Sequence, residues 1–464
     1  MLDKTIMVLY FLAMIGVGLY AYRKGKTSSS DGFFVAQRKA STMLLAGSLC
    51  ATFIGSSVVI GMVGSGYKMG LPGVWWLLVG AIGLFILGFF LARKVRRVGL
   101  YTLPELVEKQ YGSSAGLAAS MVIVVAWIAI IAAQINAAGA ILHVLLPSAD
   151  LWLLKTLAAS VFVFYTVLGG QYSIIRTDFI QFGILIIGIV LSLIFVIGDV
   201  GGISELRNSL PSDYFSFPVN ASFGWYNLVV FLILTGSTYV VGPDIYSRLF
   251  SARDEGVARS SALTAGFVAI PIAFAVVLIG MCAKVLFPAI ASDQAFPTVI
   301  QEVLPIGISG IVIAALLAAI MSSADTVLLT TSTIFSVDIC GKVFPSMGER
   351  KKVIFTRIGV AVFGLIALIV ALDLAGIIKS LLYAYTIFTS GIVIPVVAGF
   401  YKDKLRVNSI GAIAAIIGGG GTALAVKLGA FESLAGIQKL DLLGFAVCAI
   451  LLFGVSWIVN WSNR

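Results

Sequence analysis

The chain has 464 residues, of which 60% are hydrophobic and only 11% are charged, and its mean hydropathy is +1.07. Soluble domains are about half apolar and about a quarter charged, so this composition excludes an ordinary soluble protein. The net charge is +10, but the 31 Lys and Arg residues are scattered without a basic helix, so no nucleic-acid partner is expected.

Apolar segments long enough to cross ~30 Å of hydrocarbon recur along the whole chain. They lack the alternation typical of barrel strands, and a helix satisfies its backbone internally, so we predict an all-α integral membrane protein surrounded by lipid. The thirteen predicted transmembrane helices lie near 5–22, 42–69, 72–92, 117–146, 150–171, 177–198, 223–243, 261–287, 308–336, 353–375, 378–400, 408–428 and 440–460.

The positive charges indicate how these helices are oriented. Most of the 31 Lys and Arg residues, Arg248 among them, fall in loops on one side of the predicted membrane. Positive loops stay in the cytoplasm, which predicts an outside N-terminus and a cytoplasmic C-terminus in the plasma membrane of a bacterium or archaeon (the inner membrane where there are two).

Two predicted spans contain runs of glycine and hydroxyl residues that would interrupt a helix. The span 42–69 carries them at 55–57 and 61–66, and the span 223–243 carries them at 235–238. Five spans separate the two interruptions, which predicts an inverted repeat of five helices (42–198) and five helices (223–400), with one extra helix before it and two after, at 408–460. The alternative is that these small residues only allow close helix packing.

The span 308–336 places oxygen atoms on one face. Ala319, Ser322 and Ser323 stand at i, i+3 and i+4, so two hydroxyls and a carbonyl can meet. A small hard cation binds oxygen ligands, and an interrupted helix supplies free carbonyls, so this face could hold Na⁺ opposite the break in 42–69. The alternative is that each serine bonds the carbonyl four residues earlier.

Further polar residues lie at membrane depth. A carboxylate facing lipid is costly, so Asp325, next to Thr326, is expected to face the interior. Asp178 begins the span 177–198, where capping a helix and handling a cation are equally plausible. Gln134, Asn136 and Thr386 could form a solute site at the midplane or join helices.

Signs of an enzyme are missing from the sequence. The four cysteines are far apart, the single histidine His143 has no acidic partner nearby, and the glycines at 418–421 precede no Lys-Ser or Lys-Thr pair. We therefore predict a protein that is not an enzyme and that draws its energy from a gradient.

Four stretches are familiar as a set: Leu168-Gly169-Gly170 followed by Thr177-Asp178 and Gln181, Ile60-Gly61-Met62 with Gly64-Ser65-Gly66-Tyr67, Pro243-Asp244 with Arg248, and 318–325. In these the chain resembles the sodium/solute symporter family. The resemblance covers nearly the entire chain and implies a LeuT-like fold whose ten-helix core is formed by the predicted spans from 42 to 400.

The resemblance also implies ion sites. The main sodium site maps onto the carbonyls of Ala51, Ile54 and Ala319 and the hydroxyls of Ser322 and Ser323. A second cation site or exit path maps onto three further residues, namely Asp178, Asp325 and Thr326. Asp325 departs from the hydroxyl that such members use, so it could instead bind a proton or stabilise its helix.

The solute is less closely defined by the resemblance. Sugar carriers have acidic and amide side chains where this chain has Ser57 and Val58, and sodium/proline carriers have an aspartate where it has Phe53. We expect Na⁺-coupled uptake of an amino acid or a small monocarboxylate, whose anionic end a half-helix N-terminus could hold. The alternatives are a proton-coupled symporter and a solute sensor, and the oligomeric state is not indicated. The residues expected around the solute are Ser56, Ser57, Gln134, Asn136, Thr235, Ser237, Tyr239 and Thr386.

Overall fold

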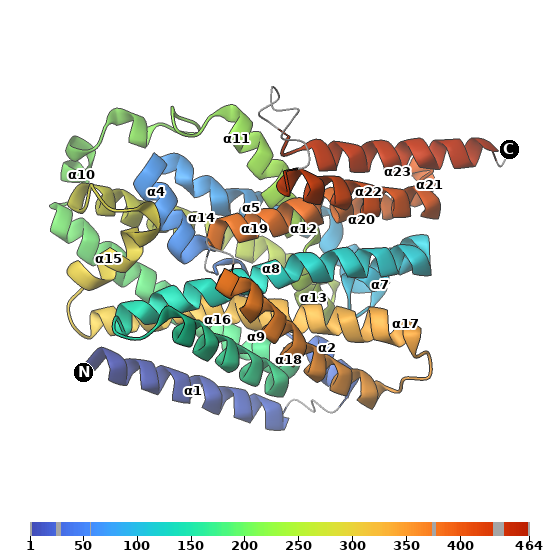
Figure 1. Cartoon of the computed structure of the whole chain (residues 1–464), viewed down its shortest axis with the longest axis horizontal. Helices are drawn as coiled ribbons and strands as arrows, with labels where there is room; N and C mark the ends of the chain where they lie inside the picture. The colour runs from blue at the N-terminus through green and yellow to red at the C-terminus, as the bar shows by residue number, and fades with distance from the viewer. Residues whose placement is uncertain (1, 25–28, 56, 374–376, 430–439, 463–464) are drawn as a thin grey trace.

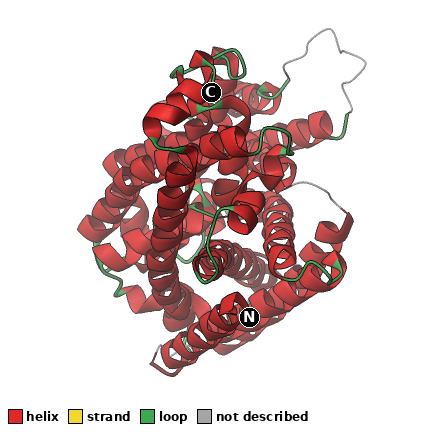
Figure 2. Ribbon diagram, turned by 90° about the vertical axis from the view of Figure 1, so that its left-hand side faces the viewer, coloured by secondary structure: helices red, strands yellow, loops and turns green. Residues whose placement is uncertain are grey.

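A computed structural model describes residues 2–24, 29–55, 57–373, 377–429 and 440–462. These residues form helices and loops, with no strand among them (Figure 2). The N- and C-termini lie at opposite ends of the bundle's long axis (Figure 1). The all-helical prediction is therefore confirmed for the described residues.

The described helices overlap the predicted spans, and the number of thirteen stays a prediction. The N-terminal half contains α1 (Leu2–Lys24), α2 (Ser30–Val35), η1 (Ala36–Arg38), α3 (Thr42–Phe53), η2 (Ser57–Met62), α4 (Val63–Met69), η3 (Leu71–Val74), α5 (Trp75–Ile86), η4 (Leu87–Leu91), α6 (Ala92–Val98), α7 (Leu103–Tyr111), α8 (Ser113–Leu145), α9 (Leu151–Val200), α10 (Ile203–Ser209) and η5 (Ser212–Phe215).

The C-terminal half is built in the same way. It contains α11 (Trp225–Val230), η6 (Phe231–Gly236), α12 (Ser237–Val241), α13 (Pro243–Ser251), α14 (Glu255–Leu286), η7 (Ser292–Gln294), α15 (Ala295–Glu302), α16 (Ile308–Ile334), η8 (Phe335–Cys340), α17 (Gly341–Val343), α18 (Glu349–Asp373), α19 (Ile377–Phe388), η9 (Thr389–Val393), α20 (Ile394–Gly399), α21 (Lys402–Leu405), α22 (Ser409–Lys427) and α23 (Leu443–Ser462).

Ten of the described helices are long and apolar enough to cross a membrane, or eleven when the bent pair Thr42–Phe53 and Val58–Met69 counts as one span. The two members of this pair are inclined by 59°. The interruption predicted in the span 42–69 is thus present as a bend between α3 and α4. The boundaries of the two repeats stay a prediction.

The predicted spans 150–171 and 177–198 both fall within α9, which consists of two helical segments joined at Gly170. Gly170 has φ 57° and ψ −178°, a conformation that side chains with a Cβ rarely adopt. Asp178 lies well inside the second segment, so its interpretation as a helix N-cap is wrong. The helix begins before it because Gly170, and not the residues at 172–176, redirects the chain.

The centre of the bundle is α16, which is buried along almost its whole length and packs against α8 and α9. By contrast, outer helices such as α23 expose large apolar side chains, including Trp457 and Trp461, as a surface in contact with lipid would. The helix predicted to carry the serine face is therefore the one furthest from lipid.

Candidate ion and solute site

The C-terminal end of α3 meets the middle of α16 through backbone carbonyls and hydroxyls. Ser322 Oγ lies 2.9 Å from the Ala51 carbonyl oxygen and 3.0 Å from that of Ala319. Ser323 Oγ lies 2.7 Å from the Thr52 carbonyl oxygen and 3.2 Å from that of Ala319. The last carbonyls of a helix have no partner within it, so the end of α3 offers free oxygens to α16.

The structure brings Ala51, Ala319, Ser322 and Ser323 together as the sequence suggested, and Thr52 is an addition. Ile54 is the C-cap of α3, and its backbone N–H donates to the Cys50 carbonyl over 3.0 Å. Both serines are almost completely buried, so this group of oxygens is shielded from lipid. We call Ala51, Thr52, Ala319, Ser322 and Ser323 the oxygen face.

The oxygen face matches the chemistry of a hard monovalent cation. Its potential ligands are all carbonyl and hydroxyl oxygens, which such cations prefer. Within the described part of the chain, no group of three or more His, Cys, Asp and Glu residues could hold a metal ion. The oxygen face contains no His or Cys, the ligands that transition metals prefer, and its oxygens suit a hard cation.

A buried ion pair lies next to the oxygen face. Arg248 Nη2 on α13 donates to Asp178 Oδ2 on α9 over 2.8 Å, and the two side chains are 0% and 1% exposed. Ser48 Oγ donates to the same carboxylate oxygen over 2.6 Å, and Arg248 also donates to Thr326 Oγ1. The assignment of Arg248 to a loop is wrong, because α13 turns back into the bundle and buries it.

Asp325 and Thr326 continue the face of α16 beyond the serines. Asp325 faces the interior, where its Oδ1 accepts a hydrogen bond from Thr166 Oγ1 over 3.1 Å. Thr326 Oγ1 donates to the Ser322 carbonyl over 2.7 Å. Two of the three residues expected around a second cation, Asp178 and Thr326, are thus already bonded to Arg248.

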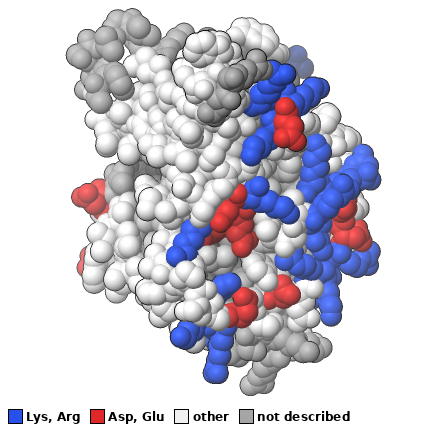
Figure 3. All heavy atoms as spheres, turned by 90° about the vertical axis from the view of Figure 1, so that its right-hand side faces the viewer, with Lys and Arg blue, Asp and Glu red and all other residues white. Residues whose placement is uncertain are grey.

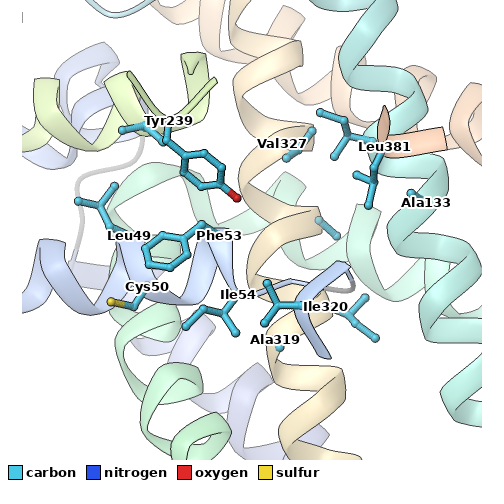
Figure 4. Close-up of a cluster of buried hydrophobic side chains, with 14 of the residues drawn as sticks. Leu49, Cys50, Phe53, Ile54, Ala133, Tyr239, Ala319, Ile320, Val327 and Leu381 are labelled. Atoms are coloured by element: carbon cyan, nitrogen blue, oxygen red, sulfur yellow. The ribbon is translucent and has the colours of Figure 1, made fainter. Parts of the chain in front are cut away.

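A cavity opens beside the oxygen face, at the break in α3. Figure 4 shows Tyr239 and Phe53 on one side of this region and Val327 of α16 on the other. The Tyr239 and Phe53 rings meet edge to face, with centroids 5.9 Å apart. The cavity is lined by Thr52, Phe53, Gly55, Trp127, Ile130, Gln134, Thr238, Tyr239, Asp244, Ile245, Ser323, Val327 and Tyr385.

Of the residues predicted around the solute, Gln134 and Tyr239 line this cavity. Four others, Asn136, Thr235, Ser237 and Thr386, do not line it. The Ser237 and Thr386 hydroxyls donate to carbonyls four residues earlier in their own helices, which is the structural alternative for such residues. Ser56 and the side chain of Ser57 lie outside the described residues.

Sequence reasoning missed most of the aromatic wall and one acid. Trp127 and Tyr385 sit in apolar runs, where an aromatic residue gives no signal of its own. Asp244 belongs to the Pro243-Asp244 motif on which the family resemblance rests, directly after the predicted span 223–243, and this motif was the available signal.

A helical bundle with a broken helix, a central group of oxygens and an adjoining cavity is the arrangement of a multi-pass membrane transporter with a LeuT-like fold. The model of the sodium:solute symporter family matches residues 33–419. The chain belongs to this family, as its motifs predicted, and the family consists of transporters and not of enzymes.

Individual relatives agree with this assignment. The chain is 28% identical to a sodium/glucose cotransporter of Vibrio parahaemolyticus, over 99% of the chain and 91% of the relative. It is 26% identical to the human sodium/myo-inositol cotransporter 2, over 79% of the chain and only 60% of that longer protein. A substrate-bound, outward-open Na⁺-coupled sialic acid symporter has the same fold, with a TM-score of 0.82, 20% identity and coverage of 99% and 98%.

Proposed function

We propose that this protein couples an inward Na⁺ gradient to the uptake of a small organic solute by alternating access. The oxygen face carries this proposal, because the Ser322 and Ser323 hydroxyls already lie 2.9 and 2.7 Å from carbonyl oxygens of α3. A Na⁺ bound there would be held by both α3 and α16. Rotating the two hydroxyl protons away would turn these hydrogen-bond donors into ligands.

Coupling between ion and solute would act through Ser323, which belongs to the oxygen face and also lines the cavity. An ion that orders Ser323 and the end of α3 prepares one wall of the cavity for the solute. Each ligand then raises the affinity for the other by the same factor, as linkage requires.

For the solute, we propose an amino acid or a small monocarboxylate. Among the described residues, the cavity lining contains no Lys or Arg, so an anionic group would have to face the bound Na⁺ or a helix N-terminus. A sugar or polyol is the second candidate, because two relatives are named for glucose and myo-inositol and the lining combines aromatic rings with Gln134.

We further propose that the N-terminus lies outside and the C-terminus in the cytoplasm. Lys and Arg side chains gather over the end of the molecule on which the C-terminus lies (Figure 3). Positive charge is retained on the cytoplasmic side of membrane proteins, which supports this orientation.

Uptake into proteoliposomes tests the proposal. Radiolabelled amino acids, short monocarboxylates and sugars would be offered under an inward Na⁺ gradient, an inward K⁺ gradient or a proton gradient. Accumulation is expected with Na⁺ alone. Equal uptake under the K⁺ and Na⁺ gradients would contradict sodium coupling, and accumulation that follows the proton gradient would establish the proton-coupled alternative. Binding without any uptake would favour a sensor.

A further inference from the structure

Asp244 is the single charged residue that lines the cavity in the described part of the chain. It stands in the first turn of α13, directly after Pro243. Its carboxylate forms no ion pair with a described Lys or Arg residue. Arg248, one turn further on, is directed to Asp178 and reaches only the backbone oxygen of Asp244, over 3.4 Å.

Asp244 lies where a helix terminus can partly offset the charge of a carboxylate. The N-terminus of a helix carries a partial positive charge, which stabilises an anion in the first turn without a basic partner. The neighbouring guanidinium of Arg248 is paired with Asp178, so no basic side chain among the described residues forms an ion pair with Asp244. A positive group on the solute could take this role.

The remaining lining matches an organic cation. Aromatic rings of Phe53, Trp127, Tyr239 and Tyr385 line the same cavity, and aromatic faces attract ammonium groups. Two lining hydroxyls are already used as donors, since Thr238 donates to the Thr235 carbonyl over 2.6 Å and Ser323 to the Thr52 carbonyl. Asp244 is the one charged group of the described lining, and an ionised carboxylate only accepts hydrogen bonds, so it suits a hydrogen-bond donor on the solute.

We propose that Asp244 binds an ammonium group of the solute, so that the cavity selects amine-bearing solutes, such as amino acids, over monocarboxylates and sugars. The inference rests on the proposed function in taking this cavity as the solute site. A monocarboxylate would bring a second negative charge next to Asp244. A sugar would leave the charge of this partly buried carboxylate uncompensated. An amino acid can offer its ammonium group to Asp244 and its carboxylate to the Na⁺ side, at Ser323.

The test uses sets of compounds that differ in one group. The melting temperature of the purified full-length protein in Na⁺ would be measured with each of the twenty amino acids, with the matching acids that lack the amino group, with the matching amines that lack the carboxyl group, and with glucose and myo-inositol. One or more amino acids are expected to raise it, while their deaminated counterparts are not.

Variants locate the effect at Asp244. In Asp244→Asn, the concentration of the stabilising amino acid needed for half of its effect should rise on the order of 10- to 100-fold, as the loss of a charge-assisted hydrogen bond predicts. Asp244→Glu should recover part of the affinity. Asp403→Asn, which removes an exposed carboxylate on α21, should leave this half-effect concentration unchanged.

Several outcomes would overturn the inference. The first is stabilisation of the wild-type protein by monocarboxylates or sugars but not by amines. The second is no stabilisation of the wild-type protein by any amine-bearing compound. The third is an unchanged affinity of Asp244→Asn for the amino acid. If Asp244→Asn does not fold, the compound series measured on the wild-type protein and the affinity of Asp244→Glu still test the inference. Stabilisation that is equal in Na⁺ and K⁺ would contradict sodium coupling and leave the role of Asp244 standing.

Discussion

The guanidinium of Arg248 and the carboxylate of Asp178 form an ion pair of 2.8 Å in the interior of the bundle, with 0% and 1% of their side chains exposed. The pair joins α13, which begins at the cavity, to α9, and it lies beside Thr326 of α16. Three helices of the transport core are thus held together at one charged contact.

Removing one partner of this pair should cost far more than removing both. Arg248→Ala leaves the Asp178 charge buried without compensation, and we expect a loss of about 3–5 kcal/mol in stability. The double variant Arg248→Ala, Asp178→Asn should lose less than the sum of the single variants. Melting temperatures of the four proteins in detergent measure this coupling, and additive losses would contradict it.

The serines of the oxygen face should set the sodium requirement. Ser322→Ala and Ser323→Ala each remove one oxygen from the face, so the Na⁺ concentration for half-maximal uptake should rise at least about tenfold, which corresponds to about 1.4 kcal/mol. Ser332→Ala is the matched control, because its hydroxyl is bonded within α16 to the Leu328 carbonyl. A similar rise in all three variants would argue against an ion at this face.

Gly55 should tolerate no side chain. A Cβ on Gly55 would overlap the Ser323 hydroxyl, so Gly55→Ala should displace this oxygen and weaken Na⁺ binding. Gly421→Ala, on the outer helix α22 and with open space around it, is the control. Sodium-dependent stabilisation should be reduced in the first variant and retained in the second. Normal Na⁺ dependence of Gly55→Ala would place the ion elsewhere.

Gly170 should be required for the turn inside α9. It has a positive φ, and a Cβ there would lie 2.7 Å from the Phe33 ring, so Gly170→Ala should destabilise the protein by about 1–3 kcal/mol. Gly183→Ala, in the same helix with nothing near its Cβ, should stabilise it by up to about 1 kcal/mol. Melting temperatures that move in these opposite directions are the expected result.

The elements that the sequence predicted share one property, which is that a short stretch defines them. The spans follow from about 20 consecutive apolar residues. The break follows from the glycines after Ile54, and the serine face follows from the helical spacing of Ala319, Ser322 and Ser323. The family motifs added the carbonyl of Ala51 to the predicted ion site. Ala51 is far from the serines in the sequence, but its carbonyl oxygen lies 2.9 Å from Ser322 Oγ.

The ion pair and the cavity depend on distant segments, and no local pattern contains them. Arg248 reads as a loop charge because the sequence after Pro243 looks like the end of a span, and only the packing of α13 buries it against Asp178. Trp127, Asp244 and Tyr385 come from three different helices and meet only in the folded bundle. Helix periodicity is a property of neighbouring residues, so the sequence alone determined the helices and the shared face of Ala319, Ser322 and Ser323, whereas the tertiary structure decided which side chains line the cavity.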